Sequence, residues 1–259
     1  MTLRPVILRF DSLPSTNTEA MRQAVLGAHE GLCVVAREQT EGRGRQGRAW
    51  ASPAGAGLYC SIVLRPRLVM IEWPLITLMT AVAVADALDE ACGLAVDIKW
   101  PNDIHASGRK LCGILAETIE TVSGRASVVG IGINLTAQSF PTTLRETATS
   151  IETLTNARPD AEDLLGALVR ALAHRYERLQ AVGGREEMRR EWSRRSSYAE
   201  GKRVRVALDA EVFEGTSRGL ADDGALRVET HDGRIKIVRA GDVTSLRDKI
   251  TTGNTAQDE

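Results

Sequence analysis

Three glycines and three arginines occur between residues 42 and 48, within the segment 38–50, which offers almost no apolar side chain for burial. Gly42, Gly44 and Gly47 can adopt positive φ angles, which turn successive backbone N–H groups toward one point. Arginine guanidinium groups bind phosphate oxygens through paired hydrogen bonds. The segment therefore predicts a phosphate-binding loop, although taken alone it also fits a solvated loop or a nucleic-acid-binding patch.

A second polar motif, Lys-Trp-Pro-Asn-Asp, occupies residues 99–103. Pro101 restricts the backbone, and Asn102 and Asp103 follow a predicted strand end, a favoured ligand position in mixed sheets. Asp103 is a candidate for binding Mg²⁺ or for assisting the deprotonation of an amine; the plain alternative is that Asn102 and Asp103 only form a turn. Lys110 begins the next predicted strand, where its ammonium can hold a carboxylate against an α-phosphate.

Polar residues also stand at the predicted start of a helix. Thr16 and Glu19 have the spacing of a capping box, so helix capping is the plain interpretation of Ser15, Thr16 and Asn17. Hydroxyl and amide groups at a helix start equally suit a neutral, urea-like ligand head, which needs donors and acceptors in fixed places. The sequence leaves both interpretations open.

Two further features suggest close approach to a ligand. Gly130 and Gly132 alternate in a predicted strand, where glycine usually means that another backbone or a ligand comes near. Trp50 ends the glycine–arginine segment, and its ring either offers a face on which a nucleotide base stacks or simply anchors the loop.

Composition narrows the class of protein. The chain has 259 residues, 43% of them apolar and 26% charged, with a formal net charge of −1. These values are ordinary for a globular protein and argue against bulk nucleic-acid or membrane binding. The four cysteines and four histidines are scattered, so we expect buried free thiols, no structural zinc and a cytoplasmic location. Thr77, Thr80 and Asp86 interrupt the longest apolar stretch, which predicts a buried amphipathic helix rather than a membrane span.

Hydrophobic periodicity and turn residues place the secondary structure. We expect strands at residues 6–10, 32–36, 58–64, 96–100, 110–119 and 126–135, and helices at 16–26, 74–91, 164–179 and 185–195, the last two covering the sheet. From residue 201, four short strands separated by Asp-Gly and Gly-Asp turns predict a small antiparallel barrel. The fold class is therefore α+β: a mixed, largely antiparallel sheet packed by helices, followed by an SH3-like β-barrel. The expected domains are 1–198 and 199–248, with a disordered tail at 249–259.

The order and spacing of these motifs resemble the catalytic core of biotin protein ligases, which is similar to that of class II synthetases. The matching segments are STN at 15–17, EQTEGRGRQGRAW at 38–50, KWPND at 99–103, RKLCGIL at 109–115 and GIGIN at 130–134, and the predicted barrel is similar to that family's C-terminal domain. The resemblance implies that biotin and MgATP give biotinyl-5′-AMP, whose biotinyl group passes to a lysine of the biotin carboxyl carrier protein of acetyl-CoA carboxylase or a related carboxylase. It implies a monomer or homodimer.

The resemblance also implies residue roles. Biotin would be bound by Ser15, Thr16, Asn17, Gln39, Gly42, Arg43, Arg45, Lys110, Gly113, Gly130 and Gly132. ATP and the adenylate would be bound by Arg43, Arg45, Arg48, Trp50, Asn102, Lys110 and Asn134. The catalytic residues would be Arg45, Lys110 and Asp103, and Mg²⁺ would accompany the ATP phosphates with Asp103 as the candidate protein ligand. We expect the loop to be displaced or poorly ordered without ligand.

Two departures and three alternatives remain. Cys112 stands where the family often has alanine, which should only tighten packing. The core begins within the first ten residues, so we expect a monofunctional ligase that does not bind DNA. The alternatives are a lipoate- or octanoate-type protein ligase, a nucleic-acid-binding regulatory protein, and a ligase that binds biotin without turnover. The motifs disfavour the lipoate- or octanoate-type ligase, and a salt-dependent duplex-binding assay would reveal a nucleic-acid-binding protein. The presence of Arg45, Asp103 and Lys110 disfavours a ligase without turnover.

Overall fold

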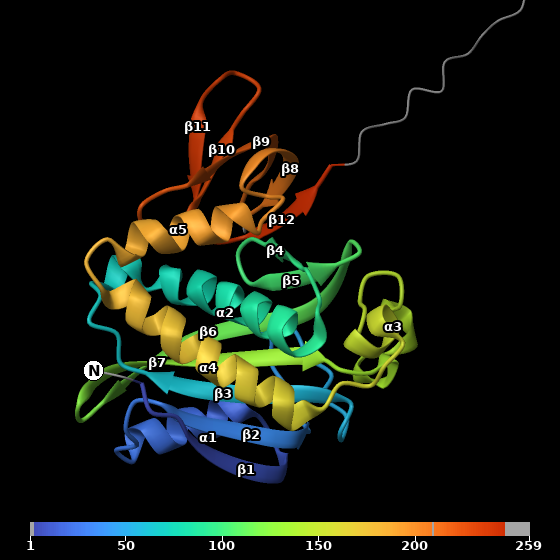
Figure 1. The fold of residues 1–259 in the computed structure, drawn as a ribbon. Coiled ribbons are helices and arrows are strands. Elements are labelled where there is room, and N and C mark those ends of the chain that lie inside the picture. Colours follow the sequence, from blue (N-terminus) through green and yellow to red (C-terminus); the bar gives the residue numbers. More distant parts are fainter. Residues whose placement is uncertain (1–2, 209, 247–259) are drawn as a thin grey trace, which may run out of the picture.

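The computed structural model describes residues 3–208 and 210–246, which form two β-sheets joined and covered by helices (Figure 1). The expected tail at 249–259 lies outside this range. The larger sheet has seven strands in the order β1-β2-β3-β7-β6-β5-β4, and only β1 and β2 are parallel. Its strands are β1 (Val6–Leu13), β2 (Leu32–Gln39), β3 (Gly57–Leu64), β4 (Asp97–Lys99), β5 (Asp103–Ala106), β6 (Arg109–Thr121) and β7 (Gly124–Asn134). The expected mixed, largely antiparallel sheet is confirmed.

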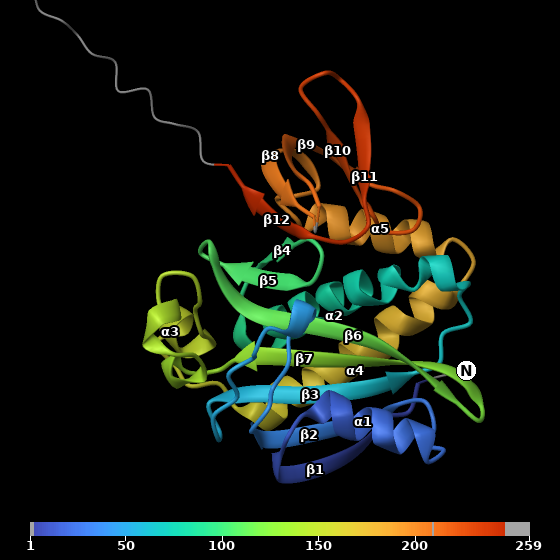
Figure 2. The same ribbon diagram turned by 180° about the vertical axis from the view of Figure 1, so that it is seen from behind.

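Helices cover both faces of this sheet (Figures 1 and 2). On one face lie α2 (Pro74–Cys92) and α4 (Ala161–Gln180), and on the other lies α1 (Thr16–Val25). The remaining helices are α3 (Ile151–Thr155) and α5 (Gly184–Arg194), with 3-10 turns η1 (Arg45–Gly47), η2 (Met70–Glu72), η3 (Ala137–Ser139) and η4 (Thr142–Leu144). The α5 helix packs on α2 and α4 and reaches β9 of the second sheet, so it does not cover the first sheet as expected.

The α2 helix is the centre of the core. Pro74 begins it, and Gly93 ends it in the left-handed conformation at φ 62°. By length and composition alone, the segment Met70–Cys92 could cross a membrane, but 72% of its apolar window is buried inside the protein. Side chains are buried on almost every side of α2 because it lies between the sheet and α4. The expectation of a buried helix holds, whereas the expectation of an amphipathic one is wrong.

The second sheet is antiparallel throughout, in the order β11-β10-β9-β8-β12. Its strands are β8 (Glu200–Ala207), β9 (Val212–Leu220), β10 (Leu226–Glu229), β11 (Ile235–Val238) and β12 (Asp242–Ser245). The sequence predicted the first four but not β12, which lies close to β4 of the larger sheet (Figures 1 and 2). Trp100 connects the sheets, since its Nε1 donates to the carbonyl of Gly224 at 3.1 Å.

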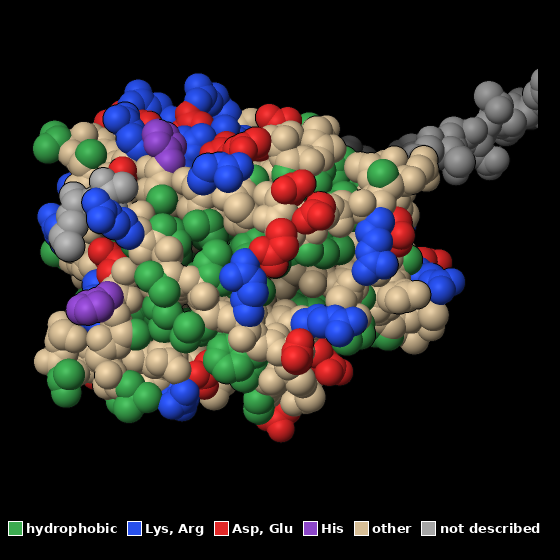
Figure 3. All heavy atoms as spheres, turned by 60° about the horizontal axis from the view of Figure 1, so that its bottom comes forward, with side chains coloured by type: hydrophobic (Ala, Val, Ile, Leu, Met, Phe, Trp, Pro, Cys, Tyr) green, Lys and Arg blue, Asp and Glu red, His purple; other side chains and the backbone are tan. Residues whose placement is uncertain are grey.

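Charged side chains are interspersed on the surface. On the face shown in Figure 3, lysines and arginines alternate with aspartates and glutamates. Ion pairs such as Arg9–Glu162 and Arg22–Glu19 are typical of this arrangement. The surface pattern therefore agrees with the formal net charge of −1.

Candidate active site

A cavity of about 330 Å³ brings together sequence motifs that lie more than a hundred residues apart. It opens at the ends of β6 and β7 and is walled by the start of α1, the loop at residues 38–50, the turn at 99–103 and β12. We call residues 38–50 the Gly–Arg loop. The predicted site residues that line the cavity are Ser15, Thr16, Asn17, Gln39, Arg43, Arg45, Arg48, Trp50, Asn102, Asp103, Lys110, Gly113, Gly130 and Gly132.

One end of the cavity is a polar subsite lined by Thr16, Asn17 and Gln39, and the fully buried Ser61 supports it through hydrogen bonds. Gln39 Oε1 accepts hydrogen bonds from the backbone N–H of Thr16 at 2.8 Å and from its hydroxyl at 3.0 Å. The Ser61 hydroxyl lies 2.7 Å from Thr16 Oγ1 and 2.6 Å from Asn17 Oδ1. Thr16 therefore does not cap α1: the N-cap is Ser15, whose side chain makes no capping bond. The capping-box interpretation is wrong.

Asn17 is fixed by three partners. Its Nδ2 donates to the carbonyl of Leu115 at 3.1 Å and to Glu117 Oε2 at 2.8 Å, while its Oδ1 faces Ser61. A Cβ at Gly130 would lie 2.2 Å from Asn17 Oδ1, a separation that real Cβ atoms do not show. Gly130 is therefore required by close approach, as its position in the strand predicted, and the approaching group is a side chain.

The glycines of the Gly–Arg loop serve different purposes. Only Gly47 has a positive φ, 70°, and its neighbour Gln46 also lies in the left-handed region at φ 56°. Gly44 has φ −114°, and Gly42 is needed because a Cβ there would lie 2.3 Å from the carbonyl oxygen of Trp50. Gly42, which was predicted to bind biotin, does not line the cavity. The expected run of three positive φ angles is wrong.

Each of the three arginines of the loop binds a different side chain. Arg43 pairs with Glu117 through both guanidinium Nη atoms, at 3.1 and 2.9 Å. Arg45 Nη1 donates to Asn102 Oδ1 at 3.2 Å, and Arg48 pairs with Asp242 of the second sheet. Burial lowers the pKa of Arg45 from its ordinary value, although the nearby carboxylates oppose this shift. The loop therefore directs three cationic groups at the rim of one cavity.

An ion pair between lysine and aspartate lies at the centre of the cavity wall. Lys110 Nζ is 2.6 Å from Asp103 Oδ1, and the two side chains are 33% and 20% exposed. Lys99 lies opposite Asp103 in the β4–β5 register and also lines the cavity. Burial lowers the pKa of Lys99, while the charge of Asp103 acts in the opposite direction. Two ammonium groups therefore face one carboxylate.

Trp50 forms the flat wall of the cavity. Gly113 and Gly132 are paired across β6 and β7, and the indole lies over both. A Cβ at Gly132 would lie 2.4 Å from Trp50 Nε1, and one at Gly113 would lie 3.0 Å from the ring. Lys110 Nζ is 5.3 Å from the ring centroid, and the buried Nε1 has no hydrogen-bond partner within the described part of the chain. The two glycines thus make room for the ring.

Asn134 does not line the cavity. It is buried, and its Nδ2 donates to the carbonyl of Thr149 at 2.9 Å. Thr149 in turn lies beside Lys110, since its N–H donates to the Lys110 carbonyl at 2.9 Å and the Lys110 N–H donates to Thr147 at 2.8 Å. Asn134 is therefore placed to support the backbone of Lys110.

The sequence missed several wall and support residues. These are Ser61, Lys99 as a wall residue, Glu117, and the β12 residues Asp242, Val243 and Thr244. A usable signal existed for Ser61, a polar residue in the strand GLYCSIVL, which is buried throughout. No signal existed for Asp242, because only tertiary structure brings β12 to the cavity.

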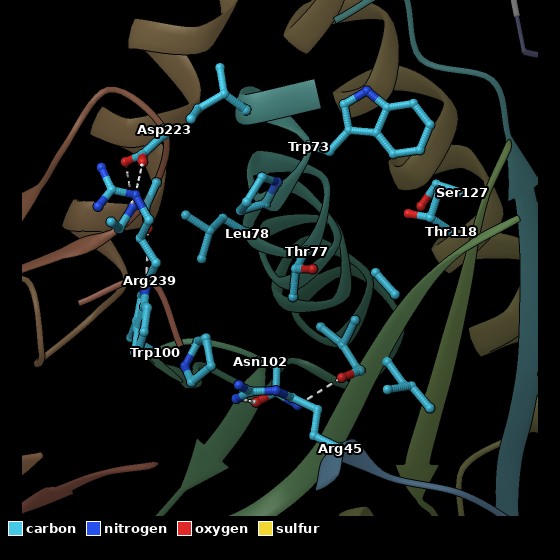
Figure 4. Close-up of a pocket in the computed structure, with 18 of the residues that line it drawn as sticks. Arg45, Trp73, Thr77, Leu78, Trp100, Asn102, Thr118, Ser127, Asp223 and Arg239 are labelled. Atoms are coloured by element: carbon cyan, nitrogen blue, oxygen red, sulfur yellow. Dashed lines mark hydrogen bonds and ion pairs between the residues drawn. The ribbon is translucent and has the colours of Figure 1, made fainter. Parts of the chain in front are cut away.

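A groove of about 470 Å³ adjoins the cavity (Figure 4). Arg45 and Asn102 lie at its floor and belong to both spaces, as do Trp100, Pro101, Ile114 and Leu115. Its other walls come from η2, the first turns of α2 and the second sheet, where Arg239 pairs with Asp223 at 2.8 Å. Met70 and Ile71 are 44% and 64% exposed at its edge. We call this space the α2 groove.

Comparison with known proteins identifies the class. The profile of the Biotin/lipoate A/B protein ligase family matches residues 9–134, and that of the Biotin protein ligase C terminal domain matches residues 201–244. The fold and the site thus define a protein ligase of the biotin/lipoate type with a second, C-terminal sheet.

Similarity to individual proteins narrows the class from biotin/lipoate ligases to biotin ligases. The chain is 37% identical over 239 residues to the bifunctional ligase/repressor BirA of Bacillus subtilis, covering 90% of this chain and 72% of that one. It is 34% identical to the biotin–[acetyl-CoA-carboxylase] ligase of Mycobacterium tuberculosis, covering 90% and 86%. The biotin protein ligase of Aquifex aeolicus, solved with biotin and ATP, superimposes with a TM-score of 0.81 at 26% identity, covering 93% and 98%. The chain belongs to the biotin protein ligases.

Proposed function

We propose that this protein activates biotin with ATP to form biotinyl-5′-AMP and pyrophosphate, and then transfers the biotinyl group to a lysine of a carrier protein. The observation that carries the proposal is the single cavity in which a polar subsite, three arginines and the Lys110–Asp103 pair meet. The Mycobacterium tuberculosis and Aquifex aeolicus proteins named above are biotin ligases, which favours biotin over lipoate or octanoate.

The polar subsite suits the ureido head of biotin. A urea group needs an acceptor for its two N–H groups and donors for its carbonyl oxygen, in fixed positions. The hydroxyls of Ser15 and Thr16 can donate and accept hydrogen bonds. The Asn17 carbonyl oxygen can accept a further hydrogen bond, and the Gln39 amide nitrogen can donate one. Leu115, Ile114 and Ile131 line the cavity beside them and suit the apolar ring and chain.

The opposite end suits the reacting phosphate. In the first step, an oxygen of the biotin carboxylate attacks the α-phosphorus of ATP, and pyrophosphate leaves. Lys110 holds the carboxylate and α-phosphate oxygens together, while Arg45 and Arg48 offset the charge of the phosphates. Trp50 offers its ring to the adenine. Asn134 contributes by holding the segment beside Lys110.

Mg²⁺ accompanies ATP in this proposal. The described residues include no group of three His, Cys, Asp or Glu side chains that could hold a metal ion by themselves. Mg²⁺ commonly binds one or two carboxylates together with substrate phosphates. Asp103 in the cavity wall is the candidate protein carboxylate for such an ion, which would neutralise phosphate charge.

In the second step, the ε-amino nitrogen of the acceptor lysine attacks the acyl carbon, AMP leaves, and the amine loses a proton. Free lysine has a pKa of about 10.4, so an acceptor for this proton helps at neutral pH. Asp103 lies in the cavity wall at the turn shared with the α2 groove, and we assign it this role.

The proposal extends to location, partner and architecture. Residues 1–198 form the catalytic domain and residues 199–248 the C-terminal domain, which contributes Asp242 to the cavity wall. The acceptor is the biotin carboxyl carrier protein of acetyl-CoA carboxylase or a related carboxylase, and the protein is a monomer or homodimer. The four free cysteines support a cytoplasmic location. Light scattering with and without biotin and ATP tests the oligomeric state.

The direct test is labelling of a purified carrier domain. With biotin, ATP and Mg²⁺, the carrier is expected to gain the mass of one biotinyl group, and pyrophosphate should appear even without carrier. Octanoate and lipoate serve as matched controls and should give no labelling. Absence of an acyl-adenylate with biotin would refute the proposal.

We also propose that the acceptor approaches through the α2 groove, because it shares Arg45 and Asn102 with the cavity and has exposed Met70 and Ile71 at its edge. Ile71→Glu places a charge on this edge and should raise the KM for the carrier roughly 10-fold, since about 1.4 kcal/mol of binding corresponds to that factor. Biotinyl-AMP formation and the trapping of its acyl group by hydroxylamine should not change. Leu26→Glu, at the exposed end of α1, is the control. Equal KM values in the two variants would exclude this route.

A further inference from the structure

Glu117 connects two segments that line the cavity, the Gly–Arg loop and the start of α1. It lies on β6, where its carboxylate accepts hydrogen bonds from Arg43 of the Gly–Arg loop at 3.1 and 2.9 Å. The same Oε2 atom that binds Arg43 also accepts from Asn17 Nδ2 at 2.8 Å. One carboxylate therefore holds a residue of the loop and a residue of the polar subsite.

The arrangement leaves little freedom to Asn17. Both kinds of atom in its amide are occupied, the nitrogen by Leu115 and Glu117 and the oxygen by Ser61. Gly130 lies directly against its Oδ1, so the amide cannot move toward β7. Glu117 thus fixes which face of Asn17 points into the subsite.

The arrangement also places Arg43 at the rim of the cavity. A bidentate contact between guanidinium and carboxylate fixes orientation as well as distance. Arg43 is 42% and Glu117 27% exposed, and exposed ion pairs contribute little to global stability. The main effect of this contact is therefore to fix the position of the loop, which also carries Arg45 and Arg48.

We propose that Glu117 is a positioning residue that holds the Gly–Arg loop over bound biotinyl-AMP through Arg43, and that it does so while fixing Asn17 in the polar subsite. The inference rests on the proposed function. It assigns no chemical step to Glu117, whose effect is on how long the adenylate remains bound. Arg43 leaves the cavity rim when the pair is broken, and the loop follows.

The test variant is Glu117→Gln, which keeps an acceptor oxygen for Asn17 but removes the negative charge that holds Arg43. We expect the dissociation rate of biotinyl-AMP to rise roughly 10-fold, because hydrogen bonds to charged groups contribute that much and changes at one interface appear mainly in dissociation rates. The KM for biotin should rise, kcat at saturation should stay near wild type, and the melting temperature should not fall. The matched control is Glu120→Gln on the same strand. Among the described residues, the Glu120 side chain pairs only with Arg125.

A double-mutant cycle tests whether Glu117 acts by positioning Arg43 or independently of it. If Glu117 acts through Arg43, adding Glu117→Gln to Arg43→Ala should change the dissociation rate little further. Additive effects, or a wild-type dissociation rate in Glu117→Gln, would overturn the inference. If Glu117→Gln unfolds, Arg43→Gln tests the same pair from the more exposed side. A wild-type protein that forms no biotinyl-AMP would instead refute the proposed function.

Discussion

Replacing Lys110 by alanine is expected to slow biotinyl-AMP formation about 100- to 1000-fold, the usual effect of removing one preorganised donor from a developing charge. Lys110 is the ammonium that faces both the carboxylate Asp103 and the ring of Trp50, and its backbone is held on both sides by residues 147–149. Its side chain is therefore fixed at the point where the carboxylate and the α-phosphate must meet. Pyrophosphate release in a single turnover, without carrier, measures the effect.

The control for this variant is Lys202→Ala in β8, where the ammonium lies 5.6 Å from the Tyr198 ring and away from the cavity. It should retain wild-type activity. The melting temperature of both variants should be recorded, because Asp103 loses one of its two ammonium neighbours in Lys110→Ala. Adenylate formation within twofold of wild type would remove Lys110 from the mechanism.

Gly130→Ala is expected to lower stability by about 1–3 kcal/mol, the usual cost of inserting a methyl group into a well-packed site. The added carbon would lie 2.2 Å from Asn17 Oδ1. Asn17 cannot withdraw without losing its hydrogen bonds to Leu115, Glu117 and Ser61. The polar subsite must therefore distort, and we expect biotin affinity to fall by at least about 10-fold, given the cost of unsatisfied buried polar groups. Thermal unfolding and titration calorimetry measure the two effects.

A glycine outside the site provides the comparison. Gly166 lies within α4, and a Cβ there would meet only the flexible end of Arg170 at 3.3 Å. Gly166→Ala should stabilise the protein by roughly 0.5–1 kcal/mol, because alanine loses less conformational entropy in a helix. If Gly130→Ala behaves like Gly166→Ala, the close approach of Asn17 is not a constraint.

Local patterns sufficed for much of the fold. The proline at residue 74 and the glycine at residue 93 locate α2, and alternating apolar residues locate β6 and β7. The short strand β5 was not predicted, because four residues following Asn102 carry too little periodicity. β12 was missed for the same reason, since its four residues depend on pairing with β8.

The candidate site was predictable where a motif carried its own chemistry. The Gly–Arg loop, the 99–103 turn and Lys110 all reach the cavity. Glu117 and Asp242 were not predictable, since each acts through an arginine more than seventy residues away in sequence. The sequence also misled the interpretation of Gly42, because a glycine required by packing and a glycine required by positive φ look identical in a sequence.

The short strand β12 has a consequence for how much ATP each round of the reaction consumes. Asp242, Val243 and Thr244 complete the cavity wall from a sheet that is separate from the one carrying the reactive groups. A mixed anhydride exposed to bulk solvent hydrolyses, so any displacement of the second sheet would let water reach the adenylate and waste ATP. The docking of the second sheet on the first therefore limits the wasteful consumption of ATP, in addition to completing the cavity wall.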